Sequence, residues 1–296
     1  MDLGAFTSGL LTGLREGVEA ALIVAIILAY LEKTGNRRHF QRVWIGVGAA
    51  VALSLLAGIA LWVTIGGLPE PAEQVFEAVA MIAAAGVVTW MLFWMRRVAA
   101  NMRGELEAKV DRSLTEGAAW GLSLLAFTAV IREGIETSLF LMAQASAASS
   151  AQAGAVAVLT GALVGLLIAV AIGFGFYRGA RVLNLRTFFR WTGVALIFIA
   201  AGLLSHAVHE LVEIGIITFG TDTAFDISGI LPHEGEGFLA LIGSLLRALF
   251  GYTSTPEWIT FLTWLAYILI VLPLYLRPVK PAEATSRPAE QTAARA

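Results

Sequence analysis

The chain has 296 residues, of which 58% are hydrophobic and 14% are charged, and its formal net charge is −2 at pH 7. With a mean hydropathy of +0.78, this composition excludes an ordinary soluble domain and indicates a polytopic membrane protein. The absence of cysteine excludes disulfides, thiolate metal sites, iron–sulfur clusters and cysteine nucleophiles, so any metal must be held by oxygen or imidazole ligands.

Seven apolar segments are long enough to cross about 30 Å of hydrocarbon at about 1.5 Å per residue. They lie near residues 6–30, 42–65, 74–97, 116–143, 153–177, 188–212 and 257–276. The first segment lacks the preceding positive charges of a secretory signal, so we interpret it as a retained span. The sequence therefore predicts an all-α integral membrane protein with seven transmembrane helices.

The basic residues predict the orientation of these helices. Of the 20 lysines and arginines, 17 lie in the connections between spans one and two, three and four, and five and six, or in the C-terminal segment. By the positive-inside rule, the N-terminus is expected outside the inner (plasma) membrane and the C-terminus in the cytoplasm. The membrane domain is thus expected over residues 1–276, with an external loop at 213–256. Residues 277–296 are rich in Pro, Ala, Glu and Arg and predict a disordered cytoplasmic tail.

One motif occurs twice, in the first and the fourth apolar segments. The copies are Arg15-Glu16-Gly17-Val18-Glu19 and, 117 residues later, Arg132-Glu133-Gly134-Ile135-Glu136. We interpret them as a duplication of a three-span unit, with repeat one at about 6–97 and repeat two at about 116–212. Because three is odd, the second copy enters the membrane from the opposite side. The fold predicted is an inverted 3+3 repeat with one extra C-terminal helix, in which the two motifs meet near the midplane.

Charged side chains inside apolar spans are expensive unless they are paired or functional. On a helix, Glu16 and Glu19 share a face, and Arg15 reaches Glu19 at the four-residue spacing that favours ion pairing. Four such glutamates and two arginines leave a charge of −2, which favours a hard multivalent cation such as ferric iron, manganese, magnesium or calcium. Proton uptake by one or two of the glutamates is an alternative way to neutralise this negative charge. A purely structural alternative is a pair of buried salt bridges, but such pairs explain only one glutamate in each motif.

Other residues suggest packing roles or a route for the cation. Gly9, Gly13 and Gly17 recur every four residues, which favours close helix packing, and a side chain at Gly17 or Gly134 is expected to stand beside the carboxylates. Polar groups gather toward the outer side, where we predict a relay or a vestibule lining: Glu77, His206, His209, Glu210 and Glu213. His209 to Glu213 is similar to a zinc-protease helix but has Glu213 in place of the second histidine.

With its doubled Arg-Glu-x-x-Glu motif, the chain resembles the oxidase-dependent high-affinity iron permease family, known from fungi and from bacterial EfeU-type ferrous iron uptake systems. Phe76-Glu77, the segment 225–229 and the segment 251–256 also fit the pattern of that family. The resemblance implies a permease without enzymatic activity or cofactor, which imports ferric iron. It implies the following site: metal ligands Glu16, Glu19, Glu133 and Glu136, with Arg15 and Arg132 as supporting charges. It also implies a separate ferroxidase or periplasmic iron-binding partner, and no nucleic acid.

Three alternatives remain open at this point. In the first, the chain is a permease for another heavy or divalent metal, such as lead or manganese. In the second, the chain is an intramembrane di-metal carboxylate enzyme, although such enzymes use Glu-x-x-His pairs that neither motif supplies. In the third, the chain is an anion carrier that binds its substrate with Arg15 and Arg132, although the surplus of carboxylates argues against this function.

Overall fold

Long apolar runs form long helices in this protein. A computed structural model describes residues 3–65, 72–98, 102–115, 120–148, 151–179, 185–233 and 237–277. Their helices are α1 (Leu3–Lys33), a 3-10 turn η1 (Arg37–His39), α2 (Phe40–Ile65), α3 (Ala72–Val98), α4 (Met102–Thr115), α5 (Gly121–Ser146), α6 (Ala151–Tyr177), α7 (Leu185–Glu213), α8 (Phe238–Phe250) and α9 (Trp258–Leu276). The described residues form no multi-residue strand, which fits the all-α class. Apart from Arg277, the predicted tail at 277–296 lies outside the described residues.

Each of the seven predicted spans coincides with one long helix. Five of these helices, α2, α3, α6, α7 and α9, are long and apolar enough to cross a membrane. The other two, α1 and α5, have 31 and 26 residues but carry an arginine and two glutamates inside them. The outer surfaces of α2 and α6 expose apolar side chains such as Val63 and Val170, which are 68% and 64% exposed. A bilayer would cover such surfaces.

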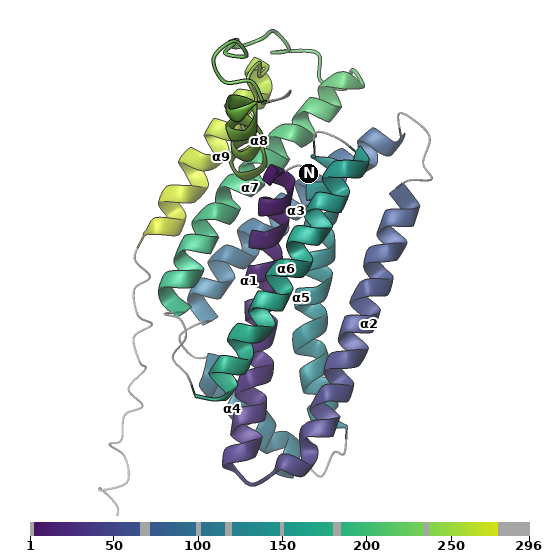
Figure 1. Ribbon diagram of the computed structural model, residues 1–296, viewed down its shortest axis with the longest axis vertical. Helices are drawn as coiled ribbons and strands as arrows, with labels where there is room; N and C mark the ends of the chain where they lie inside the picture. The colour runs from purple at the N-terminus through teal and green to yellow at the C-terminus, as the bar shows by residue number, and fades with distance from the viewer. Residues whose placement is uncertain are drawn as a thin grey trace, which may run out of the picture.

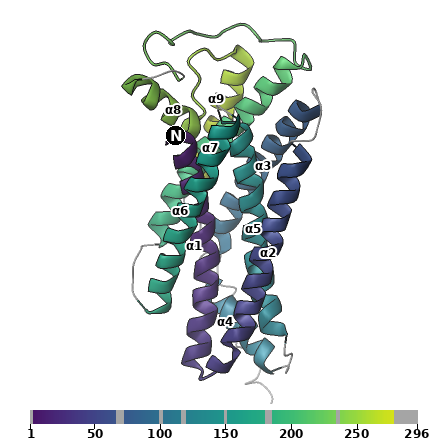
Figure 2. The ribbon, with the colours of Figure 1, turned by 45° about the vertical axis from the view of Figure 1, so that its right-hand side comes forward.

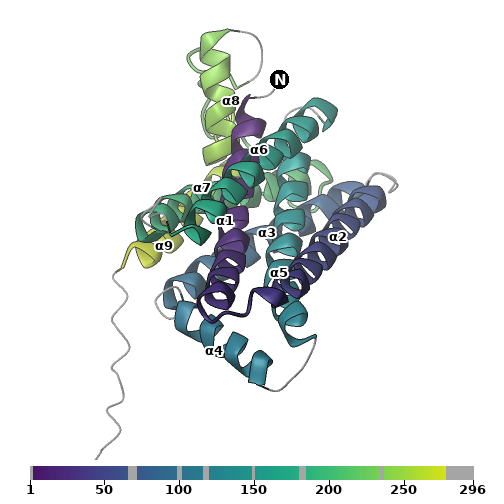
Figure 3. The ribbon, with the colours of Figure 1, turned by 60° about the horizontal axis from the view of Figure 1, so that its bottom comes forward.

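The long helices form a bundle of alternating direction (Figure 1). Helices α1, α3, α6 and α9 run one way along the bundle, and α2, α5 and α7 run the other way. Helix α1 packs along α6, α2 along α5, and α7 against α3 and α9 (Figure 2). Residues 214–233 and 237–257 lie at one end of the bundle, called here the loop end, together with the N-terminal end of α1 (Figure 1). Helix α4 lies across the opposite end, called here the α4 end (Figure 3).

Glycines allow the close approach of α1 to α6 and of α5 to α2. A Cβ atom at Gly9 or Gly13 would overlap main-chain carbonyl groups of α6, at Val158 and Ala162. A Cβ at Gly17 would lie 2.7 Å from the Cβ of Ala169 on α6, and one at Gly134 would overlap the Ser54 hydroxyl on α2. The motif glycines are therefore packing positions.

The expectation that a side chain at Gly17 or Gly134 would stand beside the carboxylates is thus wrong. Successive residues of a helix are rotated by about 100°, so the residue after Glu16 points away from the face that Glu16 shares with Glu19. The helix face that carries Gly17 packs α1 on α6, and the face that carries Gly134 packs α5 on α2.

An apolar cluster fills the α4 end of the bundle beneath the motifs. Its buried members include Ile27 and Leu31 of α1, Val43 of α2, Val110 of α4 and Leu122 of α5. A second cluster joins α3, α7 and α9. Arg15 of the first motif contacts this second cluster, with its Nη1 3.4 Å from the sulfur of Met91.

Candidate metal centre

The first motif lies near the middle of α1 and forms a compact buried ion cluster. Arg15 is 2% exposed, and its Nη1 donates to Glu16 Oε1 at 2.6 Å. Its Nη2 lies 3.1 Å from Glu19 Oε1. The predicted pairing of Arg15 with Glu19 is therefore confirmed. The argument that ion pairing leaves Glu16 unexplained is wrong, because the planar guanidinium engages both carboxylates at once.

The second motif, on α5, has the same pairing in a less enclosed setting. Arg132 Nε donates to Glu136 Oε1 at 3.1 Å and lies 3.5 Å from Glu133 Oε1. The Arg132 side chain is 32% exposed, and its guanidinium carbon lies 3.9 Å from the ring centroid of Trp94 on α3. Arg132 is thus half-buried, stabilised by an aromatic face as well as by carboxylates. The two motifs are similar in sequence but not equivalent in burial.

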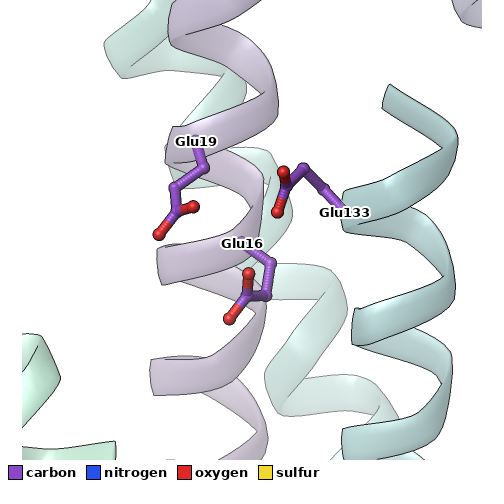
Figure 4. Close-up of side chains that lie close together, drawn as sticks. All are labelled: Glu16, Glu19 and Glu133. Atoms are coloured by element: carbon purple, nitrogen blue, oxygen red, sulfur yellow. The ribbon is translucent and has the colours of Figure 1, made fainter. Parts of the chain in front are cut away.

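The two motifs converge, and three of the four predicted glutamates meet. Glu16, Glu19 and Glu133 each offer a carboxylate oxygen, and these oxygens lie within 4.8 Å of one another (Figure 4). We call these residues the glutamate triad. All three are buried, and the second oxygens of Glu16 and Glu133 have no hydrogen-bond partner among the described residues. Glu136 is also buried but is not part of the triad.

The triad has the dimensions and the donors of a site for a hard cation. Ions of this class bind oxygen at about 2.0–2.6 Å, so two ligands on opposite sides of one ion are about 4–5 Å apart. The oxygens of the triad are no farther apart than that, since all lie within 4.8 Å of one another. Buried carboxylate oxygens without partners are costly, and a cation would satisfy them. The four motif glutamates exceed the two arginines by two charges, which also favours a cation.

The predicted relay residues lie nearer the loop end, where the structure has a cavity of about 340 Å³. We call it the loop-end cavity. Its lining includes His206 and His209 of α7 but not Glu77, Glu210 or Glu213. His206 Nε2 is 3.5 Å from Glu210 Oε1, and His209 Nε2 is 3.5 Å from Glu213 Oε1. Glu210 and Glu213 therefore contact the histidines from outside the cavity lining. The relay role of all five residues stays a prediction.

Two polar residues of this region were not singled out by the sequence. Glu257 lines the loop-end cavity, and its Oε1 is 3.1 Å from His209 Nδ1. Gln144 lines the same cavity and contacts α1. The sequence contained a signal for Gln144: it follows Glu133 by eleven residues, about three helical turns, and so lies on the same face of α5. Glu257 had none, because only the fold brings it beside α7.

Comparison with known proteins identifies a family and several relatives. The iron permease FTR1 family matches residues 7–277. Similar proteins include the ferrous iron permease EfeU of Escherichia coli O6:K15:H31 (strain 536), 38% identical over 276 residues, or 93% of this chain and 96% of the relative. The ferrous iron permease EfeU of Shigella sonnei (strain Ss046) is 38% identical over 278 residues, 93% of this chain and 97% of the relative. No solved structure matches the chain.

A more distant relative extends the likeness to another genus. The ferrous iron permease EfeU of Yersinia pestis is 34% identical over 266 residues, which are 89% of this chain and 91% of the relative. Both motifs lie within the family match, which spans nearly the whole chain. The chain therefore belongs to the iron permease FTR1 family.

Proposed function

We propose that this protein imports iron across the inner membrane through the glutamate triad. The observation that carries the proposal is the convergence of three buried carboxylates, two from α1 and one from α5, within 4.8 Å. The names of the relatives support iron as the substrate, since they are ferrous iron permeases. Glu136 and the two arginines set the charge around the ion.

The packing of the helices supports an inverted repeat of α1–α3 and α5–α7. Exchanging α1 with α5, α2 with α6 and α3 with α7 turns the α1–α6 contact into the α2–α5 contact. The same exchange leaves the α1–α5 and α3–α7 contacts unchanged, and all four contacts occur. Helices α1 and α5 run in opposite directions, as an inverted repeat requires (Figure 1). In such a repeat, alternate opening of the two ends exposes a central site to each side in turn.

The orientation follows from the basic residues. Lys33, Arg37 and Arg112 belong to the α4 end, which the positive-inside rule assigns to the cytoplasm. The loop end then faces outward, iron enters by the loop-end cavity, and residues 1–276 form the permease domain.

Ferric iron is the ion that we assign to the triad. Its ligands are carboxylates without imidazole or thiolate, and hard oxygen ligands suit a hard ion. A separate ferroxidase or periplasmic iron-binding protein would then supply the ion. Ferrous iron is the second candidate, because the relatives carry that name and because a divalent ion balances the −2 charge of the paired motifs. Uptake of iron held reduced with ascorbate, compared with uptake of ferric citrate, separates the two.

The other functions considered from the sequence have less support. The named relatives are permeases, which argues against a di-metal enzyme. An anion carrier would grip its substrate with Arg15 and Arg132, but both terminal nitrogens of Arg15 already contact glutamates, and the Nε of Arg132 lies 3.1 Å from Glu136 and 3.5 Å from Glu133.

Radiolabelled iron uptake by proteoliposomes tests the proposal. Glu16→Gln and Glu133→Gln keep the shape of the side chain but remove its negative charge, and each should abolish most uptake. The matched control is Glu32→Gln, because Glu32 lies at the end of α1 in an exposed ion pair with Arg37. This control should transport at the wild-type rate. Wild-type uptake by both triad variants would refute the proposed function.

A further inference from the structure

Polar side chains continue along α1 from the triad toward the loop end. Ser8, Thr12 and Glu16 are spaced by four residues, so they lie on one side of the helix about 6 Å apart along its axis. Ser8 is 3% exposed and Thr12 is fully buried at 0%. Small hydroxyl groups at these positions lead from the triad into the region where α1, α5 and α7 meet.

Gln144 of α5 faces this line of hydroxyl groups. Its side-chain amide Nε2 donates to Thr12 Oγ1 at 2.8 Å, which joins α5 to α1. Gln144 is 6% exposed, and its Oε1 has no hydrogen-bond partner among the described residues. Leaving a buried carbonyl oxygen without a partner is costly, and a cation would satisfy it. Gln144 lines the loop-end cavity and also contacts Thr12, one turn of α1 from Glu16, so its side chain lies between the cavity and the triad.

The opposite direction along α1 is apolar. After Glu19, the buried side chains of α1 include Leu22, Ile27 and Leu31. Ile27 and Leu31 meet Val110 of α4 and Leu122 of α5 in the cluster that fills the α4 end. In this conformation, buried polar side chains lead from the triad toward the loop end, where the cavity lies.

We propose that Gln144 Oε1, held in place by the hydrogen bond from Gln144 Nε2 to Thr12, forms an intermediate binding position for the cation between the loop-end cavity and the glutamate triad. The inference rests on the proposed function and adds a residue to its entry route. A neutral amide oxygen attracts a cation less strongly than three carboxylates do. An ion held there is therefore drawn onward, as conduction through successive sites requires.

Iron uptake kinetics in proteoliposomes test the role of Gln144, with the iron salt that the wild-type protein transports faster as the probe. Gln144→Leu removes the oxygen at similar volume and should raise KM about tenfold, the effect of losing an interaction worth about 1.4 kcal/mol. Equilibrium iron binding by the detergent-solubilised variant should stay at the wild-type level, because the triad is intact. The control is Gln41→Leu, which changes an exposed glutamine of α2 and should leave KM unchanged.

Gln144→Glu separates an oxygen ligand from mere helix packing. This variant keeps an oxygen at the position and should have a KM at or below that of the wild type. A wild-type KM in Gln144→Leu would overturn the inference, and so would a KM raised in Gln144→Glu. If Gln144→Leu does not fold, the KM of Gln144→Glu decides alone. Inactive Glu16→Gln together with wild-type kinetics in Gln144→Leu would refute this inference and leave the proposed function standing.

Discussion

Replacing Arg15 by methionine should destabilise the protein strongly. Arg15 is buried and holds two carboxylates, at 2.6 Å and 3.1 Å. Methionine fills much of the same space but leaves Glu16 and Glu19 without their cation. Removing one partner of a buried ion pair costs about 3–5 kcal/mol, since the remaining charge stays buried without compensation. Typical proteins have a total stability of only about 5–15 kcal/mol.

The assay is unfolding of the detergent-solubilised protein, with and without iron. Arg37→Met is the matched control, because Arg37 forms an ion pair with Glu32 in which the two side chains are 67% and 39% exposed. Exposed pairs contribute about 0–1 kcal/mol, so the control should unfold almost like the wild type. Iron should restore part of the lost stability in Arg15→Met, because a cation that binds only the folded state stabilises it by about 2.7 kcal/mol at a concentration of 100 Kd.

Arg15→Lys provides an intermediate case. It keeps the positive charge, but a lysine ammonium is a point charge and does not hold two carboxylates in a planar fork. Its stability should fall between those of the wild type and Arg15→Met, and its iron uptake should be damaged. Equal stability of Arg15→Met and Arg37→Met would refute the reasoning about buried charge. Wild-type uptake by Arg15→Lys would show that the arginine is only a neutralising charge.

Two further predictions concern packing and the external loop. Gly17→Leu should destabilise the protein by about 1–3 kcal/mol or more, because its Cβ would press on Ala169. The control Gly86→Leu, with open space around the glycine, should unfold like the wild type. Equal unfolding of the two variants would contradict the packing role of Gly17. The Ser228 hydroxyl and backbone N–H donate to Asp226 Oδ1 at 2.7 Å and 2.9 Å, which lowers the pKa of Asp226. The resulting stabilisation is present above the ordinary carboxyl pKa and is lost as the pH falls through the lowered pKa. Ser228→Ala should raise that pKa toward its ordinary value in a carboxyl NMR titration, and an unchanged pKa would exclude the hydroxyl as a cause.

The sequence was sufficient to predict the seven long helices and the motif residues, but not the shorter helices α4 and α8, which lie in the predicted connections. Long apolar runs have few alternatives to helices in a bilayer, because every backbone polar group must be satisfied within the membrane. Four-residue spacing was also enough to predict the pairing of Arg15 with Glu19 and of Arg132 with Glu136, since both members of each pair lie on one helix. Such local relations depend only on helix geometry. The count of seven crossings and the inverted repeat remain predictions.

Contacts between helices had to come from the tertiary structure. The crossing of α1 and α5 decides that Glu133 joins Glu16 and Glu19 while Glu136 does not. Rotation of α1 against α6 decides that Gly17 packs on Ala169 and not beside the carboxylates. The contact of Gln144 with Thr12 joins residues 132 positions apart. Spacing along one helix is fixed by its covalent geometry, but the depth and rotation at which two helices meet depend on all the side chains between them.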